Sequence, residues 1–255
     1  MAHGIAETYQ PKLDFMIVGA QKCGTTALWE YLGAHPQVGM SKPKEVHLFS
    51  APNYSPDWSP AEIDHRYAPW FAHCPEAKKL GEVTPIYMFL PDVAPELKRY
   101  NPRLKLIVLL RDCAERAISN YYMQRARGKE RLPIGLALLA EPWRLWRCGN
   151  PREKGSPYRF HSYRARSLYS RQLVNLYRHF PSEQVLLVSS VELRSDHRRT
   201  LRRVFAFLDV EPLDMEPIMA LPGSLHGKRH HPILSWLLQM SFWAERRRSK
   251  GLYRL

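Results

Sequence analysis

The stretch Phe15-Met16-Ile17-Val18-Gly19-Ala20-Gln21-Lys22-Cys23-Gly24-Thr25-Thr26-Ala27-Leu28 decides the fold of this chain. Its first four residues form a short apolar run that ends at Gly19, which is typical of a buried strand in a parallel sheet. Apolar residues then recur at helical spacing from Ala27 to Leu32. The segment between the two patterns therefore predicts a tight loop that connects a strand to a helix.

A second unit of the same kind begins with the apolar run 104–110, which we expect to be the most buried strand. Asp112 and Glu115 follow with the spacing of a helix start signal, and this helix is predicted to run to about Arg127. Further strands are predicted over 79–84 and 184–189, and further helices over 162–179 and 197–208. Strands that alternate with helices favour an α/β fold, a P-loop-like parallel β-sheet flanked by helices on both faces.

The chain length of 255 residues is sufficient for one large core, and we predict a single domain over residues 1–255. The segment 128–161 breaks the alternation, because it is rich in Gly, Pro, Trp and Arg and has no clear period. We interpret this segment as an insertion in the domain.

The balance of charges is strongly basic. Lys and Arg outnumber Asp and Glu by 38 to 24, which gives a net charge of +14. Such an excess favours anionic partners such as nucleic acids, phosphorylated cofactors or anionic membranes, and charge alone does not distinguish among them.

The compartment is predicted from what the sequence lacks. No apolar run reaches the ~20 residues that span a bilayer, and the first residues lack a signal-peptide pattern, so we expect a cytoplasmic protein. Its four cysteines are scattered without a C-x-x-C pair, which predicts neither a disulfide framework nor a zinc site.

The loop after the first strand has the glycine frame of a phosphate-binding loop, Gly19-x-x-x-x-Gly24-Thr25-Thr26. In such a loop, backbone N–H groups and the N-terminus of the next helix surround a phosphate. A nucleoside triphosphatase has lysine directly after the second glycine, whereas this chain has Thr25 there and carries Lys22 inside the loop. The run 104–110 leads into a cation, Arg111, and Asp112 is interpreted as a helix cap and not as an acid that holds Mg²⁺. The pattern predicts a phosphate site without a kinase's metal.

Two segments carry a resemblance to a known family. The segment Gln21-Lys22-Cys23-Gly24-Thr25-Thr26-Ala27-Leu28 resembles the 5′-phosphosulfate loop of sulfotransferases that use 3′-phosphoadenosine 5′-phosphosulfate (PAPS), and is most similar to the heparan sulfate branch. The segment Arg111-Asp112-Cys113-Ala114-Glu115-Arg116-Ala117-Ile118-Ser119-Asn120-Tyr121-Tyr122 resembles the segment of that family that binds the 3′-phosphate. The residues that the resemblance implies for cofactor binding in these segments are Lys22, Cys23, Gly24, Thr25, Thr26, Arg111 and Ser119. A donor with two separate anionic groups needs two anion sites, which two strand-to-helix junctions would supply. For Ser119 the alternative is a small residue at a helix contact.

The acceptor side is indicated by two further segments. Lys42-Pro43-Lys44-Glu45-Val46-His47-Leu48-Phe49 resembles the family segment that carries the general base, which implies Glu45 in this role, with His47 as the alternative. Such a base must lie within ~3 Å of the acceptor's proton. Glu45 could instead form a surface ion pair, and His47 could be a hydrogen-bonded wall. The segment 81–87 resembles one that lines the acceptor cleft, which implies that Thr84 and Tyr87 bind acceptor oxygens, although a strand end before a Pro turn explains this composition equally well.

Near the C-terminus, Gly227-Lys228-Arg229-His230-His231-Pro232 is similar to the family's loop that closes over the cofactor phosphates, with the order of Gly and Lys exchanged. The resemblance implies that Gly227, Lys228 and Arg229 bind cofactor. The adjacent histidines raise a metal site as the rival interpretation, and because Cys and acidic partners are missing nearby, no metal is expected. The segment 233–250 combines an apolar face with basic residues, so it either packs on its own domain or contacts an anionic membrane.

The resemblance implies an enzyme that transfers a sulfuryl group from PAPS to a hydroxyl or amine of a carbohydrate, lipid or small-molecule acceptor by in-line displacement. Glu45 or His47 would take the acceptor's proton, and Lys22 would stabilise the leaving phosphate. The alternatives are a P-loop nucleotide or small-molecule kinase, a basic nucleic-acid-binding protein, or an inactive relative that only binds cofactor. The motif arginines lie at strand ends and not in a basic stripe with stacking aromatics, so no nucleic-acid partner is expected. We expect 128–161 to select the acceptor, whose identity the sequence leaves open.

Overall fold

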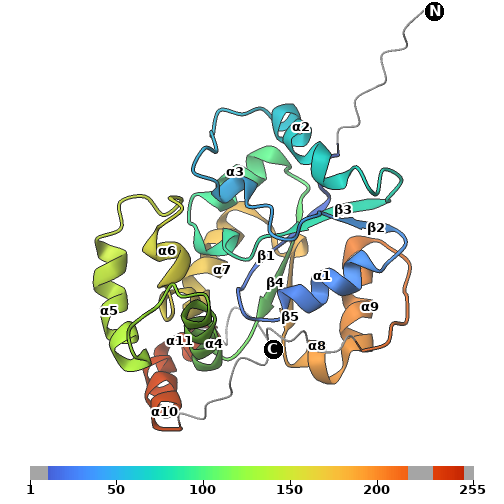
Figure 1. Ribbon diagram of the computed structural model, residues 1–255. Helices are drawn as coiled ribbons and strands as arrows, with labels where there is room; N and C mark the ends of the chain where they lie inside the picture. The colour runs from blue at the N-terminus through green and yellow to red at the C-terminus, as the bar shows by residue number, and fades with distance from the viewer. Residues whose placement is uncertain (1–10, 218–231, 250–255) are drawn as a thin grey trace, which may run out of the picture.

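A five-stranded parallel sheet forms the centre of the protein (Figure 1). The computed structural model describes residues 11–217 and 232–249. The strands are β1 (Phe15–Gly19), β2 (Val38–Met40), β3 (Lys79–Val83), β4 (Lys105–Leu110) and β5 (Val185–Ser189), in the order β2-β3-β1-β4-β5. All four neighbouring pairs are parallel, so the carboxyl ends of all the strands lie at one edge of the sheet.

Helices cover both faces of the sheet (Figure 1). Helix α1 (Thr25–Gly33) leads from β1 toward β2 in one direction, whereas α3 (Val93–Tyr100) and α7 (Tyr169–His179) precede β4 and β5 in the other. Because crossovers between parallel strands are right-handed, opposite directions place these helices on opposite faces. Helix α9 (His197–Leu208) packs beside α1, where His197 stacks on Tyr31 with ring centroids 6.1 Å apart. The α/β fold with a parallel sheet is therefore confirmed.

Most of the predicted elements occupy their predicted places. Strands β1, β3, β4 and β5, helix α9, and helix α4 (Cys113–Ala126) agree with the sequence patterns to within a residue or two. Asp112 caps α4, because its carboxylate accepts a hydrogen bond from the backbone N–H of Glu115 at 2.9 Å. The predicted helix 162–179 is wrong in its first turns: a 3₁₀ turn covers Ala165–Ser167, and α7 begins only at Tyr169.

The elements that were not predicted include β2, α2 (Pro60–Phe71), α3 and α5 (Ile134–Trp146). Prolines lie inside two of these helices, Pro69 in α2 and Pro142 in α5. An internal proline normally breaks a helix, so it conceals the periodicity. Strand β2 has only three residues, too few for an alternating pattern to emerge.

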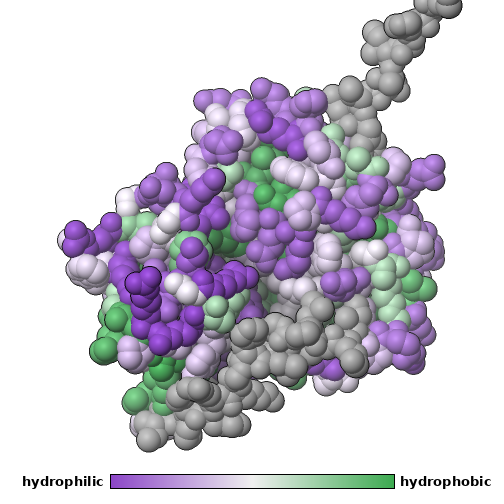
Figure 2. All heavy atoms as spheres, viewed as in Figure 1, coloured by the Kyte–Doolittle hydropathy of each residue, from purple (hydrophilic) through white to green (hydrophobic). Residues whose placement is uncertain are grey.

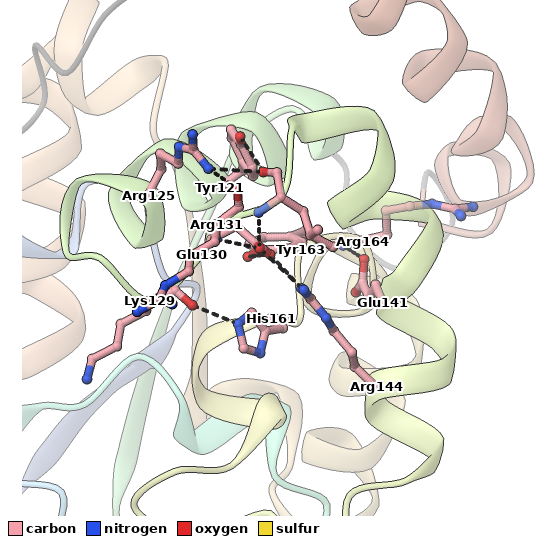
Figure 3. A network of polar contacts seen from close by, with 11 residues as sticks. Tyr121, Arg125, Lys129, Glu130, Arg131, Glu141, Arg144, His161, Tyr163 and Arg164 are labelled. Atoms are coloured by element: carbon pink, nitrogen blue, oxygen red, sulfur yellow. Dashed lines mark hydrogen bonds and ion pairs between the residues drawn. The ribbon is translucent and has the colours of Figure 1, made fainter.

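The segment 128–161 contains α5 and α6 (Pro157–Phe160) and is tied to the rest of the molecule by a buried polar network (Figure 3). The carboxylate of Glu130 accepts a hydrogen bond from the Tyr163 hydroxyl at 2.8 Å and pairs with Arg144 of α5 at 2.5 Å. Burial would raise the pKa of Glu130, but Arg144 and the hydrogen bonds outweigh burial and lower it to about 2. A second carboxylate, Glu141, accepts from the backbone N–H groups of Arg164 and Ala165. The segment is thus fixed to the stretch just before α7.

The C-terminal described helices are α10 (Pro232–Ser241) and α11 (Trp243–Ser249), and a short helix, α8 (Glu192–Ser195), precedes α9. Glu245 of α11 is buried and accepts hydrogen bonds from the backbone N–H and the hydroxyl of Ser170, at 2.6 and 2.7 Å. This pair fixes α11 to the beginning of α7. None of the helices in the two described ranges has both the length and the apolar character that crossing a bilayer requires.

Candidate active site

The topology of the sheet determines where a ligand can bind. The chain leaves β1 toward β2 on one side and later crosses from β3 to β4 on the other, so the direction changes between the adjacent strands β1 and β4. In open α/β sheets the crevice at such a switch point, outside the carboxyl ends of the strands, is where ligands bind. The loop after β1 and Arg111 after β4 both lie there.

The phosphate loop has the backbone conformation of an anion cradle. Lys22 and Gly24 both adopt left-handed conformations, with φ of 71° and 95°. Position 24 requires glycine because of this backbone conformation and not for lack of space: a Cβ on Gly24 would come no closer than 3.8 Å to the side chains of Leu109 and Leu193. Gly24 is exposed and is also the N-cap of α1, with no side chain that caps the helix. The first N–H groups of α1 therefore point toward a place that an anion can reach.

Some of the other residues of this loop can contact an anion, whereas others are buried in the core. The Cys23 side chain is fully buried, 3.5 Å from the Tyr169 hydroxyl, and burial raises the pKa of its thiol. Cys23 can therefore contribute to an anion site only through its backbone. Thr25 is nearly buried and Thr26 is partly exposed at the first turn of α1. Gly19 is required by packing, because a Cβ there would meet the Met88 sulfur at 1.8 Å.

Lys22 lies at the centre of a cluster of cations. Burial lowers the pKa of its ammonium group, and the charges of Arg127, Arg111 and Lys44 lower it further, whereas Glu45 opposes the shift. The positive charges of Arg127, Arg111 and Lys44 therefore repel that of Lys22, and a bound anion would relieve this repulsion. The structure thus brings together Lys22, Arg111 and Glu45, which the sequence placed in one site, and adds Arg127 and Lys44 to them.

Arg111 presents its guanidinium group at the carboxyl end of β4. The Nε and Nη2 groups donate to one carboxylate oxygen of Glu115, at 2.9 and 2.7 Å, in an i, i+4 pair at the start of α4. Glu115 is mostly exposed, so an incoming phosphate can displace it or share the donors. Ser119 lies about two turns into the same helix and is partly exposed.

Glu45 and His47 form a linked pair on the segment after β2. Glu45 accepts from the Lys44 ammonium at 2.9 Å through one oxygen, and its other oxygen lies 3.5 Å from Nε2 of His47. Burial alone would raise the pKa of Glu45, but His47 and Lys44 lower it from 4.5 to about 2. Nδ1 of His47 lies 3.1 Å from the hydroxyl of Ser50, so both ring nitrogens of His47 have partners. Glu45 thus forms the ion pair with Lys44 that the alternative interpretation expected, and its charge also acts on Lys22.

Thr84 and Tyr87 do not face an open cleft. Both are buried, and the Thr84 hydroxyl accepts from the backbone N–H of His47 at 3.3 Å, while the Tyr87 hydroxyl accepts from that of Phe49 at 3.2 Å. The prediction that these residues bind acceptor oxygens is corrected accordingly: they position the Glu45–His47 segment. Next to them, burial raises the pKa of the Glu82 carboxyl to about 7.

Buried arginines lie on the interior side of the phosphate loop, and the sequence patterns did not predict them. Arg166 is almost fully buried, and its Nη1 donates to the side-chain oxygen of Gln21 at 2.6 Å. Burial and then the charges of Arg116 and Arg159 lower the pKa of Arg166 to about 9. One sequence signal existed: Arg166 is three residues before buried Tyr169 and seven before buried Leu173, so it shares their apolar spacing. A cation at such a position indicates a buried polar partner.

Gly227, Lys228 and Arg229 lie outside the described residues, as do His230 and His231. Within 11–217 and 232–249, no three His, Cys, Asp or Glu side chains are grouped so that they could hold a metal ion.

Comparisons with known proteins identify relatives of this chain. The chain is 31% identical over 212 residues to human bifunctional heparan sulfate N-deacetylase/N-sulfotransferase 2, covering 78% of this chain and 22% of that protein. It is 30% identical over 209 residues to mouse heparan sulfate glucosamine 3-O-sulfotransferase 3B1, covering 77% and 46%. It therefore spans only a fifth to a half of these relatives.

Among solved structures, a sulfotransferase from Alicyclobacillus acidocaldarius superposes with a TM-score of 0.77 at 26% identity, covering 95% of this chain and 96% of that one. The sulfotransferase domain from the curacin biosynthetic pathway, at 14% identity and a TM-score of 0.54, shares the fold. The family model described as a sulfotransferase domain matches residues 12–221, so the chain belongs to the sulfotransferase domain family.

Proposed function

We propose that this protein transfers a sulfuryl group from PAPS to a hydroxyl or amine of an acceptor, with a carbohydrate as the favoured acceptor class. The observation that carries the proposal is the convergence of Lys22, Lys44, Arg111 and Arg127 on one site, in which Glu45 opposes the repulsion on Lys22. The other carboxylate there, Glu115, is exposed and pairs with Arg111. A donor with a 5′-phosphosulfate and a 3′-phosphate fits two cationic strand ends that lie side by side. A kinase is not favoured, because the lysine after the second glycine is missing.

The residues at the phosphate loop provide electrostatic stabilisation. PAPS supplies the activated sulfuryl group. Lys22 and the first N–H groups of α1 stabilise the negative charge that grows on the leaving phosphate, and the helix fixes the N–H groups before reaction. Arg166 holds Gln21 from inside the protein and so helps to fix the loop. Arg111, with Ser119 on the same helix, binds the 3′-phosphate.

Glu45 is the proposed base, and its environment makes the proposal specific. With a pKa of about 2, Glu45 is a weak base while Lys44 and His47 hold it. An anionic donor beside Lys22 and Lys44 competes for the Lys44 ammonium, and this raises the pKa of Glu45 toward a more effective value. His47 lies 3.5 Å away and is the alternative base.

The acceptor class rests on the relatives, which include an N-sulfotransferase and a 3-O-sulfotransferase named for heparan sulfate. We propose that 128–161 contributes to selecting the acceptor, because the Glu130 and Glu141 anchors join it to the stretch that holds Arg166. Cytoplasmic location stays a prediction from the sequence.

The experiment is mass spectrometry of acceptors incubated with the protein and PAPS. Two unsulfated glucosamine-containing polysaccharides, one with free amines and one with acetylated amines, separate N-transfer from O-transfer, and a metabolite extract covers small acceptors. We expect a mass gain of one sulfuryl group and release of adenosine 3′,5′-bisphosphate, both lost in Lys22→Ala. Absence of both products, together with phosphoryl transfer from ATP, would contradict the proposal.

A further inference from the structure

Exposed apolar side chains concentrate at one end of the molecule. Eight of the eleven large hydrophobic side chains that are exposed in the described residues belong to α5, α10 and α11. We call these eight the aromatic face: Leu136, Leu139, Trp143, Trp146, Trp236, Leu237, Met240 and Trp243. Figure 1 shows α5 and the α10–α11 pair at the same end of the molecule, and Figure 2 shows hydrophobic residues there beside strongly hydrophilic ones. Half of the face is tryptophan.

The helices that carry this face are fixed to the protein. Glu141 and Glu245 are the carboxylates of α5 and α11, and both are buried and bonded to groups of the domain. Packing of the helices on their own domain is therefore already complete, with Leu138 and Leu238 buried. The aromatic face is the surface that this packing leaves over.

The exposed charges carried by these helices and by Arg147 at the end of α5 are positive. Arg147 lies over the Trp143 ring at 4.9 Å, and Arg247 lies over the Trp243 ring at 4.4 Å. Arg248 is exposed on the same helix as Arg247. Since both carboxylates of these helices are buried, no exposed acidic side chain on the described parts of α5, α10 and α11 offsets these cations.

We propose that the aromatic face docks the protein on the surface of a lipid bilayer with anionic headgroups. Tryptophan prefers the interface between headgroups and acyl chains, and helices with Trp and Leu on one side and Arg beside them lie in that interface. Leu139 and Trp146 are 77% and 82% exposed, so they project from the surface and can insert between lipids. A second copy of the chain is disfavoured as the partner. In a symmetric dimer through this face, Arg147, Arg247 and Arg248 of one copy would lie near the same arginines of the other copy and repel them.

An open depression at the C-terminal end of α5 adds a place for a headgroup. It has a volume of about 360 Å³ and its lining includes Trp143, Arg144, Arg147, Glu153 and Ser156. Arg144 is engaged by Glu130, whereas Arg147 forms no ion pair with a carboxylate among the described residues, so it is the cation that can meet a phosphate there.

The test is cosedimentation of the full-length chain with vesicles of phosphatidylcholine alone and of phosphatidylcholine with phosphatidylglycerol. We expect binding that requires phosphatidylglycerol and weakens with salt. The double variant Leu139→Ser/Trp146→Ser should lower the partition coefficient by about tenfold or more, since two inserting side chains are lost. Arg247→Gln/Arg248→Gln should weaken binding only to the anionic vesicles. The control is Val191→Ser, which removes an apolar side chain that is 56% exposed at the N-cap of α8, away from the aromatic face, and it should bind like the wild type.

Three results would overturn the proposal. The first is no vesicle binding by a folded wild-type protein. The second is binding that saturating adenosine 3′,5′-bisphosphate abolishes, because the cations of the active site would then hold the vesicle. The third is a wild-type dimer in sedimentation velocity that the double variant converts to a monomer, which would assign the aromatic face to a second copy. Circular dichroism of each variant confirms that it is folded.

Discussion

Replacement of Glu45 by glutamine separates the proton-accepting role of this residue from its structural role. The side chain keeps its shape and one acceptor oxygen, but it loses the charge that Lys44 and His47 surround. If Glu45 removes the proton of the acceptor, turnover in Glu45→Gln should fall by about 10²-fold or more. Affinity for adenosine 3′,5′-bisphosphate should stay near that of the wild type or increase slightly, because a negative charge beside the anion site is removed.

The effect on stability follows from the pKa. A value of about 2 against the ordinary 4.5 corresponds to a preference for the ionised form of roughly 3 kcal/mol. The side chain is 32% exposed, so solvent screening reduces this contribution to roughly 1–2 kcal/mol. The pKa is lowered in the folded state, so the contribution is present above pH 4.5 and is lost as the pH falls toward 2. Denaturant unfolding of both proteins at a series of pH values measures it.

The turnover assay is release of adenosine 3′,5′-bisphosphate in the presence of the acceptor. Glu115→Gln is the matched control, since Glu115 is also a carboxylate beside a cation of the site but faces Arg111, and its turnover should stay close to that of the wild type. Near-normal turnover of Glu45→Gln, with an inactive but folded His47→Ala, would refute the reasoning and assign the base to His47.

Three further predictions concern the anion sites and the core beside them. Arg111→Ala should weaken binding of adenosine 3′,5′-bisphosphate by about 2 kcal/mol in calorimetry, because a charge-assisted phosphate contact is lost; unchanged affinity would remove Arg111 from the site. Lys22→Ala should lower turnover and also weaken PAPS binding, since the ammonium faces the phosphosulfate in ground and transition states; a loss of turnover with unchanged affinity would restrict Lys22 to the transition state. Burial raises the pKa of Glu82 to about 7, so the stability that Glu82 contributes is present below pH 4.5 and is lost as the pH rises through 7. In unfolding experiments the stability of Glu82→Gln relative to wild type should therefore increase by up to about 3 kcal/mol between pH 4.5 and 7, and a pH-independent difference would contradict the burial argument.

Local patterns were sufficient for the parts of the fold that local interactions determine. The apolar run before Gly19 and the run 104–110 are buried strands that pair with each other, and Asp112 caps α4 as its spacing indicates. The switch point between these strands places Lys22 and Arg111 at one crevice, whereas the sequence links the two anion motifs only through the family resemblance.

The parts that the sequence did not reveal depend on distant contacts. Thr84 lies in a segment that resembles the lining of an acceptor cleft, but its hydroxyl accepts a hydrogen bond from the backbone N–H of His47, 37 positions earlier in the chain. Arg166 donates a hydrogen bond to Gln21, which lies 145 positions earlier in the chain, and no local sequence pattern indicates that pairing. The period of α5 is interrupted by Pro142, and its glutamate, Glu141, is buried because it holds the backbone of Arg164 and Ala165.

The central claim is that the two adjacent strand ends bind the two anionic groups of the PAPS nucleotide without a metal. The most direct measurement is isothermal titration calorimetry of the wild-type protein with adenosine 3′,5′-bisphosphate and with ATP, each in EDTA and in excess Mg²⁺. We predict that the bisphosphate binds more tightly than ATP and that EDTA does not weaken its binding. Binding of ATP that requires Mg²⁺, with no preference for the bisphosphate, would contradict the claim.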